Sequence, residues 1–303
     1  MTGLPKITIV TPSYNQGKFL EKTILSVLDQ GYPNLEYIII DGGSTDGSVD
    51  IIRRYEKHLA YWVSEPDRGQ SHALNKGFER ATGEIFGWLN SDDWYLPGAL
   101  NAVAESFAAQ PDAGAIVGAG EMYFEETGTS MLFEPYPLTL KSLFQAIHKH
   151  IMQPSCFFAQ AAWRDCGPLD EALHLAMDFD LWLRIAKKYS FTTIRNNLSV
   201  SRVHASAKTT AMAAESYADS IFVMHRNGGE SEARACLVEF LSELLVKRRE
   251  TIHLQNELYH SIKSREQERE ELRKQITAIH GSLSWKITQP LRLCCDVLLK
   301  LIR

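Results

Sequence analysis

The stretch ITIVTPSYNQGKFLEKTILSVLDQGYPNLEYIIIDGGSTDGS, residues 7–48, decides the fold. Residues 7–10 form a short apolar run that ends in a Thr-Pro-Ser turn signal, and residues 37–40 form a second, β-branched run. Between them, apolar residues at helical spacing predict a helix over residues 17–30, and residues 48–55 predict another. Strands and helices that alternate through short loops predict a parallel sheet with helices on both faces.

The same alternation continues along the chain, which predicts one α/β domain. Further strands are predicted at residues 61–64, 85–89, 115–117 and 157–159. Further helices are predicted at residues 70–81, 97–107 and 178–188. The stretch from about residue 120 to 155 is less regular.

The composition fits a soluble α/β protein with an extension. The chain has 303 residues, and its net charge of −5 argues against nucleic acid as a partner. Five cysteines without CxxC spacing predict free thiols in a reducing compartment. The first residues lack the pattern of a signal peptide, and no run of about 18 apolar residues predicts a spanning helix. We therefore expect a cytoplasmic location.

Polar clusters follow four of the predicted strands. They are Thr11–Asn15, Asp41, Glu65–Arg68 and the pair Asp92-Asp93. Each cluster alone is typical of a turn, because Asp, Asn and Ser favour turns. Ligands of parallel α/β sheets bind at the carboxyl ends of the strands, so four clusters at that edge predict a binding site.

Asp92 and Asp93 are the most informative pair. Two adjacent carboxylates after a buried strand are costly unless a positive charge lies between them. Mg²⁺ or Mn²⁺ fits, because such ions bind one or two carboxylates together with substrate phosphates. The chain has neither a GxxxxGK[ST] loop nor a GxGxxG motif after a strand. A metal ion, not a glycine-rich loop, is therefore expected to hold a diphosphate.

Three segments resemble family 2 glycosyltransferases: residues 11–48, residues 64–100 (SEPDRGQSHALNKGFERATGEIFGWLNSDDWYLPGAL) and residues 177–189 (MDFDLWLRIAKKY). The resemblance covers roughly residues 5–210. It implies the GT-A fold, an α/β nucleotide-binding domain with a mostly parallel mixed sheet covered by helices. It also implies an inverting, metal-dependent transfer of a sugar from a nucleoside-diphosphate sugar to an acceptor hydroxyl, in the assembly of bacterial-type surface polysaccharide or glycolipid.

The resemblance also implies a role for each matching residue. The donor nucleotide would contact residues at the strand ends: Thr11, Pro12, Tyr14, Asp41, Asp67, Arg68 and Asp92. Asp93 would be the direct metal ligand at the family's DxD position, with His204 as the candidate second ligand. The acceptor side would include Gln153, Asp180 and Trp182. The alternative for His204 is a structural histidine, and Arg202 beside it is a candidate phosphate partner.

The resemblance places the general base at Asp178. An inverting transfer needs one carboxylate to take the proton of the acceptor hydroxyl, and it needs no second acid because the metal stabilises the leaving diphosphate. Asp before an apolar helical run is also typical of a helix N-cap, so both roles stay open. The chain departs from the family at two positions: Gly42 stands where a second Asp often follows Asp41, and Met177 stands where Glu often precedes the base.

The character of the chain changes at about residue 236. A heptad frame with mostly apolar residues runs through a segment dense in Glu, Lys and Arg. The predicted domains are therefore 1–235, a helical, coiled-coil-like stalk at 236–280 and an amphipathic tail at 281–303. The stalk is a candidate for homo-oligomerisation, and the alternative is a solitary solvated helix. The tail, with Trp285 and four basic residues, is predicted to lie on the inner face of a membrane, and the alternative is packing on protein.

Two other functions stay as alternatives. A nucleotidyltransferase on a related sheet needs a glycine-rich phosphate loop near the N-terminus, which the chain lacks. A catalytically inactive scaffold would use only the coiled coil, and the acidic residues at positions 41, 92, 93 and 178 argue against it. The expected partners are a nucleotide-sugar donor and a glycan or lipid-linked acceptor.

Overall fold

The computed structural model describes residues 3–145, 151–205 and 207–281. Within them lies a nine-stranded mixed sheet in the order β3-β2-β1-β4-β8-β6-β9-β5, with β7 paired to β6. The strands are β1 (Ile7–Ser13), β2 (Leu35–Asp41), β3 (Tyr61–Ser64), β4 (Ile85–Trp88), β5 (Trp94–Tyr95), β6 (Ala113–Phe124), β7 (Thr129–Phe133), β8 (Cys156–Ala159) and β9 (Ser190–Val203). β3, β2, β1 and β4 run parallel, and so do β6 and β9, whereas β8 is antiparallel to both of its neighbours.

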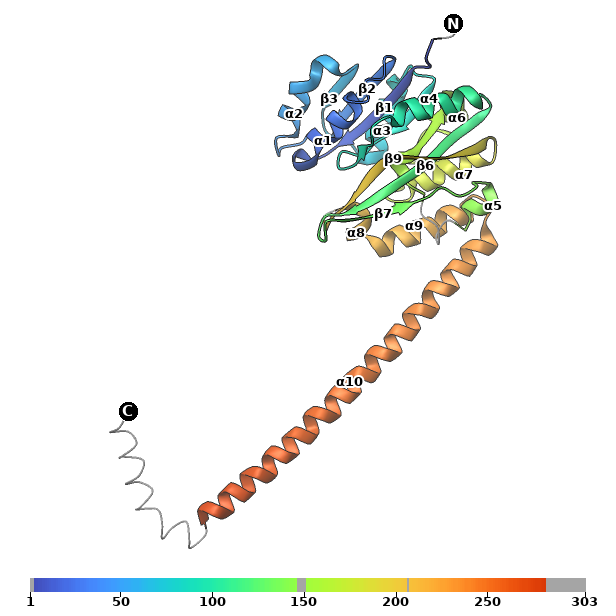
Figure 1. Cartoon of the computed structure of the whole chain (residues 1–303). Coiled ribbons are helices and arrows are strands. Elements are labelled where there is room, and N and C mark those ends of the chain that lie inside the picture. Colours follow the sequence, from blue (N-terminus) through green and yellow to red (C-terminus); the bar gives the residue numbers. More distant parts are fainter. Residues whose placement is uncertain (1–2, 146–150, 206, 282–303) are drawn as a thin grey trace, which may run out of the picture. The chain divides into compact units, whose positions relative to one another are not determined.

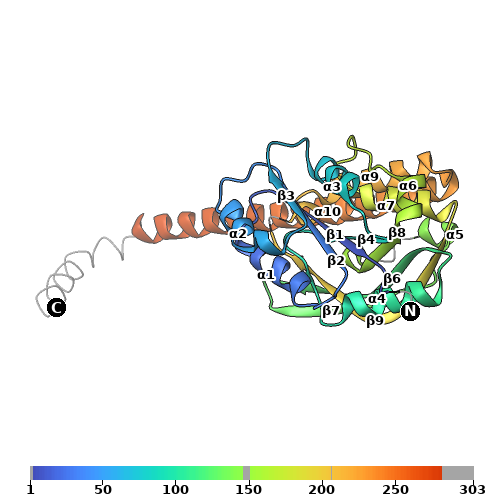
Figure 2. The same ribbon diagram turned by 90° about the horizontal axis from the view of Figure 1, so that it is seen from above.

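Helices cover both faces of this sheet (Figures 1 and 2). One face carries α1 (Gly17–Leu28), α2 (Ser48–Tyr55) and α4 (Ala99–Ala109), whose apolar side chains share one buried cluster. The other face carries α3 (Gln70–Arg80), α6 (Gln160–Cys166), α7 (Met177–Ala186) and α9 (Ala213–Arg226). Shorter helical segments are η1 (Glu56–His58), α5 (Leu140–Leu143), η3 (Gln153–Ser155) and α8 (Lys208–Ala211).

The strand sequences explain this two-sided core. Along β1, Ile7 and Ile9 belong to the cluster with α1, whereas Val10 belongs to the cluster with α3. Along β2, Ile39 and Ile40 divide in the same way. Successive side chains of a strand point to opposite faces, so strands that are buried along nearly their whole length are what a sheet covered on both faces requires.

The later strands differ from the sequence prediction. β6 extends over residues 113–124 rather than 115–117, and the sequence pattern predicts neither β7 nor β9. β7 is largely exposed and most of β9 is exposed or half-buried, so both lack the apolar run that marks a buried strand. Backbone pairing with β6 holds both strands in the sheet.

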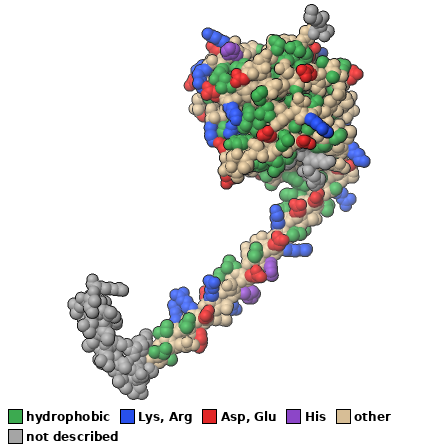
Figure 3. Space-filling model, viewed as in Figure 1, with side chains coloured by type: hydrophobic (Ala, Val, Ile, Leu, Met, Phe, Trp, Pro, Cys, Tyr) green, Lys and Arg blue, Asp and Glu red, His purple; other side chains and the backbone are tan. Residues whose placement is uncertain are grey.

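The chain divides into two compact units, residues 1–237 and residues 238–303. The long helix α10 (Glu230–Gly281) begins in the first unit, where Ala233 and Cys236 are buried in the core. In the second unit its apolar side chains are exposed between charged ones (Figure 3). None of the helices in the described part of the chain combines the length and apolar character needed to cross a membrane. The membrane contact is predicted for a tail at residues 281–303, which lies outside the described residues from position 282 on.

Candidate functional site

The carboxyl ends of β1, β2 and β3 lie side by side. Ser13 pairs with Asp41, and Asp41 pairs with Ser64, so the loops that follow these strands start at one edge. β4 lies on the other side of β1 and leads into the turn at residues 90–93. The polar clusters of the sequence therefore share one rim of the sheet.

Asp41 shapes the loop after β2. The residue is fully buried, and its carboxylate accepts hydrogen bonds from the Ser44 N–H at 2.8 Å, the Ser44 hydroxyl at 2.6 Å and the Ser64 hydroxyl at 2.7 Å. Thr11 and Pro12 are buried as well. These three side chains support the rim from inside the fold.

Tyr14, Gly42 and Asp67 converge on this rim from three loops. A Cβ atom at Gly42 would lie 2.8 Å from Asp67 Oδ2 and 3.2 Å from Tyr14 Cδ2. Tyr14 is 62% exposed and Asp67 is half-buried. An accessible ring and a carboxylate therefore both lie next to Gly42. A larger residue at position 42 would collide with the Asp67 carboxylate. This collision explains why a glycine stands at this position.

Arg68 follows on the same loop and is exposed. Its Nη2 lies 2.6 Å from Glu171 Oε2, so its charge is paired at the surface, where ion pairs are weak and exchangeable. Both residues lie in the wall of a cavity of about 670 Å³ between α3 and the segment that follows α6. Arg68 therefore stands at the boundary between the rim and this cavity.

Asp93 is built into the protein interior. It is 3% exposed, its Oδ1 accepts a hydrogen bond from the Arg202 backbone N–H at 2.9 Å, and its Oδ2 accepts one from Asn90 Nδ2 at 3.2 Å. Burial, followed by the negative charge of Asp92, raises the pKa of the Asp93 carboxyl above its ordinary value. The first bond joins the turn after β4 to β9, and the second lies within the turn.

Asp92 is the more accessible residue of the pair. Its side chain is 18% exposed, and its Oδ2 lies 3.1 Å from Nε2 of His204, which is 112 residues further along the chain. Within residues 3–145, 151–205 and 207–281, no group of three or more His, Cys, Asp or Glu side chains is arranged to hold a metal ion. A carboxylate and an imidazole nevertheless suit a divalent ion whose remaining ligands are substrate phosphates and water.

Gln153 braces the same turn. Its Oε1 accepts a hydrogen bond from Asn90 Nδ2 at 3.1 Å, and its Nε2 donates to the Trp88 carbonyl at 2.8 Å. Asn90 Oδ1 in turn accepts a hydrogen bond from Gln70 Nε2 at 2.8 Å. The turn that carries both acidic residues is thus fixed from several sides, and sequence reasoning does not find Asn90.

Asp178 lies in the first turn of α7. The N-cap of this helix is Ala176, with a φ of 54°, so Asp178 is not the N-cap that the sequence left open. Its Oδ1 accepts a hydrogen bond from the Phe179 N–H at 2.8 Å. Burial raises the pKa of the Asp178 carboxyl above its ordinary value, against the opposing effects of backbone N–H groups and of the Lys208 charge. A raised pKa suits a general base.

Lys208 has no sequence signal, because its role depends on the fold. It follows His204 by four residues and donates a hydrogen bond to the His174 carbonyl oxygen, just before α7. Its positive charge acts on Asp178. The segment after β9 therefore places His204 beside Asp92, and it places the charge of Lys208 where it acts on Asp178.

Asp180 and Trp182 lie inside the fold, which differs from the acceptor-side expectation. Asp180 is 1% exposed, and its carboxylate accepts hydrogen bonds from Arg184 Nε at 2.8 Å and Asn227 Nδ2 at 2.9 Å. It also lies 2.8 Å from Arg226 Nη2. Trp182 is part of the buried core. These contacts hold α7 against α9 and the residue that follows it.

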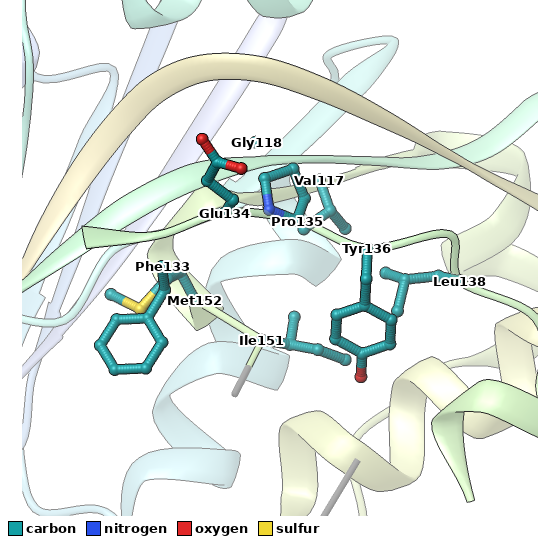
Figure 4. Close-up of a pocket in the computed structure, with 9 residues that line it drawn as sticks. All are labelled: Val117, Gly118, Phe133, Glu134, Pro135, Tyr136, Leu138, Ile151 and Met152. Atoms are coloured by element: carbon teal, nitrogen blue, oxygen red, sulfur yellow. The ribbon is translucent and has the colours of Figure 1, made fainter. Parts of the chain in front are cut away.

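A second cavity lies apart from the rim, beside β6 and the segment after β7 (Figure 4). Its volume is about 10 Å³, and Val117, Phe133, Tyr136 and Ile151 are among its lining residues. This volume leaves room for about one water molecule, so the cavity cannot hold a nucleotide.

The comparison with protein families decides the assignment. Residues 8–165 match the model of Glycosyl transferase family 2, and this match spans more than half of the chain and four of the rim's strands. The chain belongs to glycosyl transferase family 2.

Curated relatives of this family 2 chain carry related names. An uncharacterized glycosyltransferase of Rickettsia typhi is 30% identical over 212 residues, which are 68% of this chain and 66% of the relative. An uncharacterized glycosyltransferase of Mycobacterium tuberculosis is 30% identical over 197 residues, 64% of this chain and 74% of the relative. A putative teichuronic acid biosynthesis glycosyltransferase of Bacillus subtilis is 45% identical over 94 residues, 29% of this chain and 36% of the relative. The chain thus spans just under two thirds of the length of the Rickettsia relative.

Solved structures share the fold. S. aureus TarS 1-349 in complex with UDP-GlcNAc matches with a TM-score of 0.60 and 18% identity, over 78% of this chain and 71% of that chain. The mannosyltransferase PcManGT from Pyrobaculum calidifontis, in complex with GDP-Man and Mn²⁺, matches with a TM-score of 0.55 and 19% identity, over 84% and 81%. The predicted GT-A architecture is confirmed.

Proposed function

We propose that this family 2 chain is an inverting glycosyltransferase that moves a sugar from a nucleoside-diphosphate sugar to an acceptor hydroxyl. The observation that carries the proposal is the meeting of Asp92 with His204, on the rim where Tyr14 and Asp67 also converge. An aromatic ring suits a nucleobase, and a carboxylate beside an imidazole suits a metal-bound diphosphate.

The donor contacts follow from the accessible groups of the rim. The exposed Tyr14 ring stacks on the base, the Asp67 carboxylate accepts a hydrogen bond from the base or ribose, and Arg68 faces the diphosphate charge. Thr11, Pro12 and Asp41 act indirectly, because they are buried and support these loops. The TarS complex with UDP-GlcNAc and the PcManGT complex with GDP-Man support a nucleotide sugar as the donor class.

Asp92 and His204 are the proposed ligands of Mg²⁺ or Mn²⁺, which when bound would stabilise the charge on the leaving diphosphate. Asp93, which the resemblance favours as the direct ligand, is assigned instead to hold the turn in place. Both of its oxygens accept hydrogen bonds from protein donors in the interior. The Mn²⁺ in the mannosyltransferase complex supports a divalent ion in this fold.

Asp178 is the proposed general base. As the acceptor oxygen forms a bond to the anomeric carbon, the bond from that carbon to the diphosphate oxygen breaks, and the proton of the acceptor hydroxyl moves to the Asp178 carboxylate. Attack from the face opposite the leaving group inverts the anomeric configuration. The nucleoside diphosphate leaves as an anion, so no general acid is needed.

The acceptor is proposed to be a glycan or lipid-linked glycan in surface polysaccharide assembly, in line with the name of the Bacillus relative. The exposed apolar side chains of α10 beyond residue 238 are proposed to pair with a second copy of the chain.

The test is a donor screen with the purified chain. UDP- and GDP-sugars are incubated with Mn²⁺, and release of the nucleoside diphosphate is measured for the wild-type chain and for Asp178→Asn. We expect one donor class to be hydrolysed slowly by the wild-type chain, and we expect the variant to bind that donor without turnover, with a thermal shift like that of the wild type. Thermal shifts and turnover that are absent with every donor would contradict the proposal.

A further inference from the structure

Arg202 lies in a box of three aromatic rings from three different elements. Its guanidinium carbon is 4.7 Å from the ring centroid of Phe19 on α1, 5.0 Å from that of Trp94 on β5 and 5.7 Å from that of Tyr123 on β6. Tyr123 and Arg202 are direct partners in the sheet, where β9 runs beside β6 (Figure 1). A guanidinium within about 6 Å of aromatic rings is attracted by their quadrupoles.

The same residue bonds to the turn that carries both acidic residues. Its backbone N–H donates to Asp93 Oδ1 at 2.9 Å, and its Nε–H donates to the Asp92 carbonyl oxygen at 3.3 Å. The Phe19 ring also packs against the His204 ring, with their centroids 4.8 Å apart. The box therefore contacts the main chain of Asp92 and the ring of His204, the two proposed metal ligands.

We propose that Arg202 is a positioning residue that sets Asp92 and His204 at the separation at which they bind one divalent ion, and that it is not itself a phosphate ligand. This inference rests on the proposed function of the rim. Three rings surround the guanidinium and its Nε–H is directed at a protein carbonyl, so the sequence expectation that Arg202 pairs with phosphate is replaced by a role inside the fold.

Substitution by lysine separates the two roles, because it keeps the charge and changes the geometry. Lysine has no planar guanidinium to stack on three rings, and it has no N–H at the position from which Nε reaches the Asp92 carbonyl. A cation that acts only through its charge on phosphate would be largely replaced by lysine. A positioning residue would not be replaced.

The experiment compares the wild-type chain with R202K, D92N and the double variant R202K/D92N. Binding of Mn²⁺ in the presence of UDP or GDP is followed by the electron paramagnetic resonance signal of free Mn²⁺. Hydrogen exchange of residues 90–95 is measured without any ligand. R80K is the matched control, because Arg80 also lies over an aromatic ring, 4.3 Å from the Tyr61 centroid, at the end of β3 opposite the rim.

We expect R202K to weaken Mn²⁺ binding about tenfold, the scale of one hydrogen bond from a charged donor, and to speed exchange at residues 90–95. R80K should change neither quantity. In the D92N background R202K should cost less than in the wild-type chain, because one of the two ligands that it positions is already altered. Unchanged exchange in R202K, or a loss that adds in full to that of D92N, would overturn the inference. A wild-type chain that binds no Mn²⁺ with either nucleotide would contradict the proposed function, and the inference would fall with it.

Discussion

The turn after β4 and the first turn of α7 each carry two acidic residues close together in sequence. In the turn, Asp93 is 3% exposed and tied to β9, whereas the Asp92 side chain keeps 18% exposure beside His204. In α7, Asp180 is 1% exposed and bound by arginines, whereas Asp178 remains half-buried. One carboxylate of each pair is held by partners inside the fold, and the other is the one that we propose takes part in the reaction. In both pairs the partners of each carboxylate, and not its order in the sequence, distinguish the buried residue from the accessible one.

The largest effect is expected at Asp92. Asp92→Asn, or excess EDTA added to the wild-type chain, should lower transfer by about three powers of ten, because metal stabilisation of the leaving diphosphate is worth several kcal/mol. Release of nucleoside diphosphate measures the loss, and the melting temperature without ligand should stay near that of the wild type. Full turnover in EDTA would show that the mechanism needs no metal. The proposed division of roles between Asp92 and Asp93 would then be wrong.

The second effect is expected at Asp178. Asp178→Asn keeps the size of the side chain but removes its basicity, so turnover should fall by about two to four powers of ten while donor binding stays unchanged. The anomeric configuration of the wild-type product, read by NMR, should be inverted. A variant that turns over at nearly the wild-type rate would move the base to another residue.

The third effect is expected on the stability of the fold, where Asp180 and Asp178 should differ. Asp180→Asn leaves Arg184 and Arg226 without their shared anion, and breaking a buried ion pair in this way costs about 3 kcal/mol. Urea unfolding should show this loss, whereas Asp178→Asn, the neighbouring control, should unfold near the wild-type midpoint. Equal stability of the two variants would mean that Asp180 stabilises the fold no more than Asp178 does.

The pH profile gives a smaller but more specific effect. A general base works only when deprotonated, so activity is lost as pH falls through the pKa of Asp178, which burial holds above the ordinary Asp value. The acid limb of kcat should therefore lie above pH 3.8, the ordinary value. Lys208→Met removes a charge that lowers this pKa, so the limb should move to higher pH. An acid limb that stays at the wild-type pH would show that the charge of Lys208 does not act on the base.

The rim could be predicted from the sequence because its signals are local. Each polar cluster directly follows an apolar run, and parallel strands end at the same edge, so Tyr14, Asp67 and Asp92 fall together once the strands are assigned. The resemblance of the same segments to family 2 glycosyltransferases implies the GT-A fold.

The resemblance already names Asp178 as the base, but the partners that distinguish the two carboxylates of each pair could not be predicted, because they lie far along the chain. Asp93 is held by the backbone of Arg202, 109 residues later, and Asp180 is held by Arg226, 46 residues later. β9, which supplies the first of these contacts, is mostly half-buried or exposed and carries no regular apolar run. Two neighbouring aspartates look alike until such partners are in place.

The smallest effect on chemistry is expected from α10. Every residue of the two acidic pairs lies in the first compact unit, so a chain that ends at Leu245 should keep wild-type kcat with a soluble acceptor. Ending there leaves two helical turns after Leu237, so fraying of the new terminus does not reach the buried Cys236. Sedimentation should show a single copy for the shortened chain and a larger assembly for the full chain, because the exposed apolar residues beyond position 245 are removed. A shortened chain with normal stability but much lower kcat would show that the second unit, or a second copy of the chain, contributes to the site.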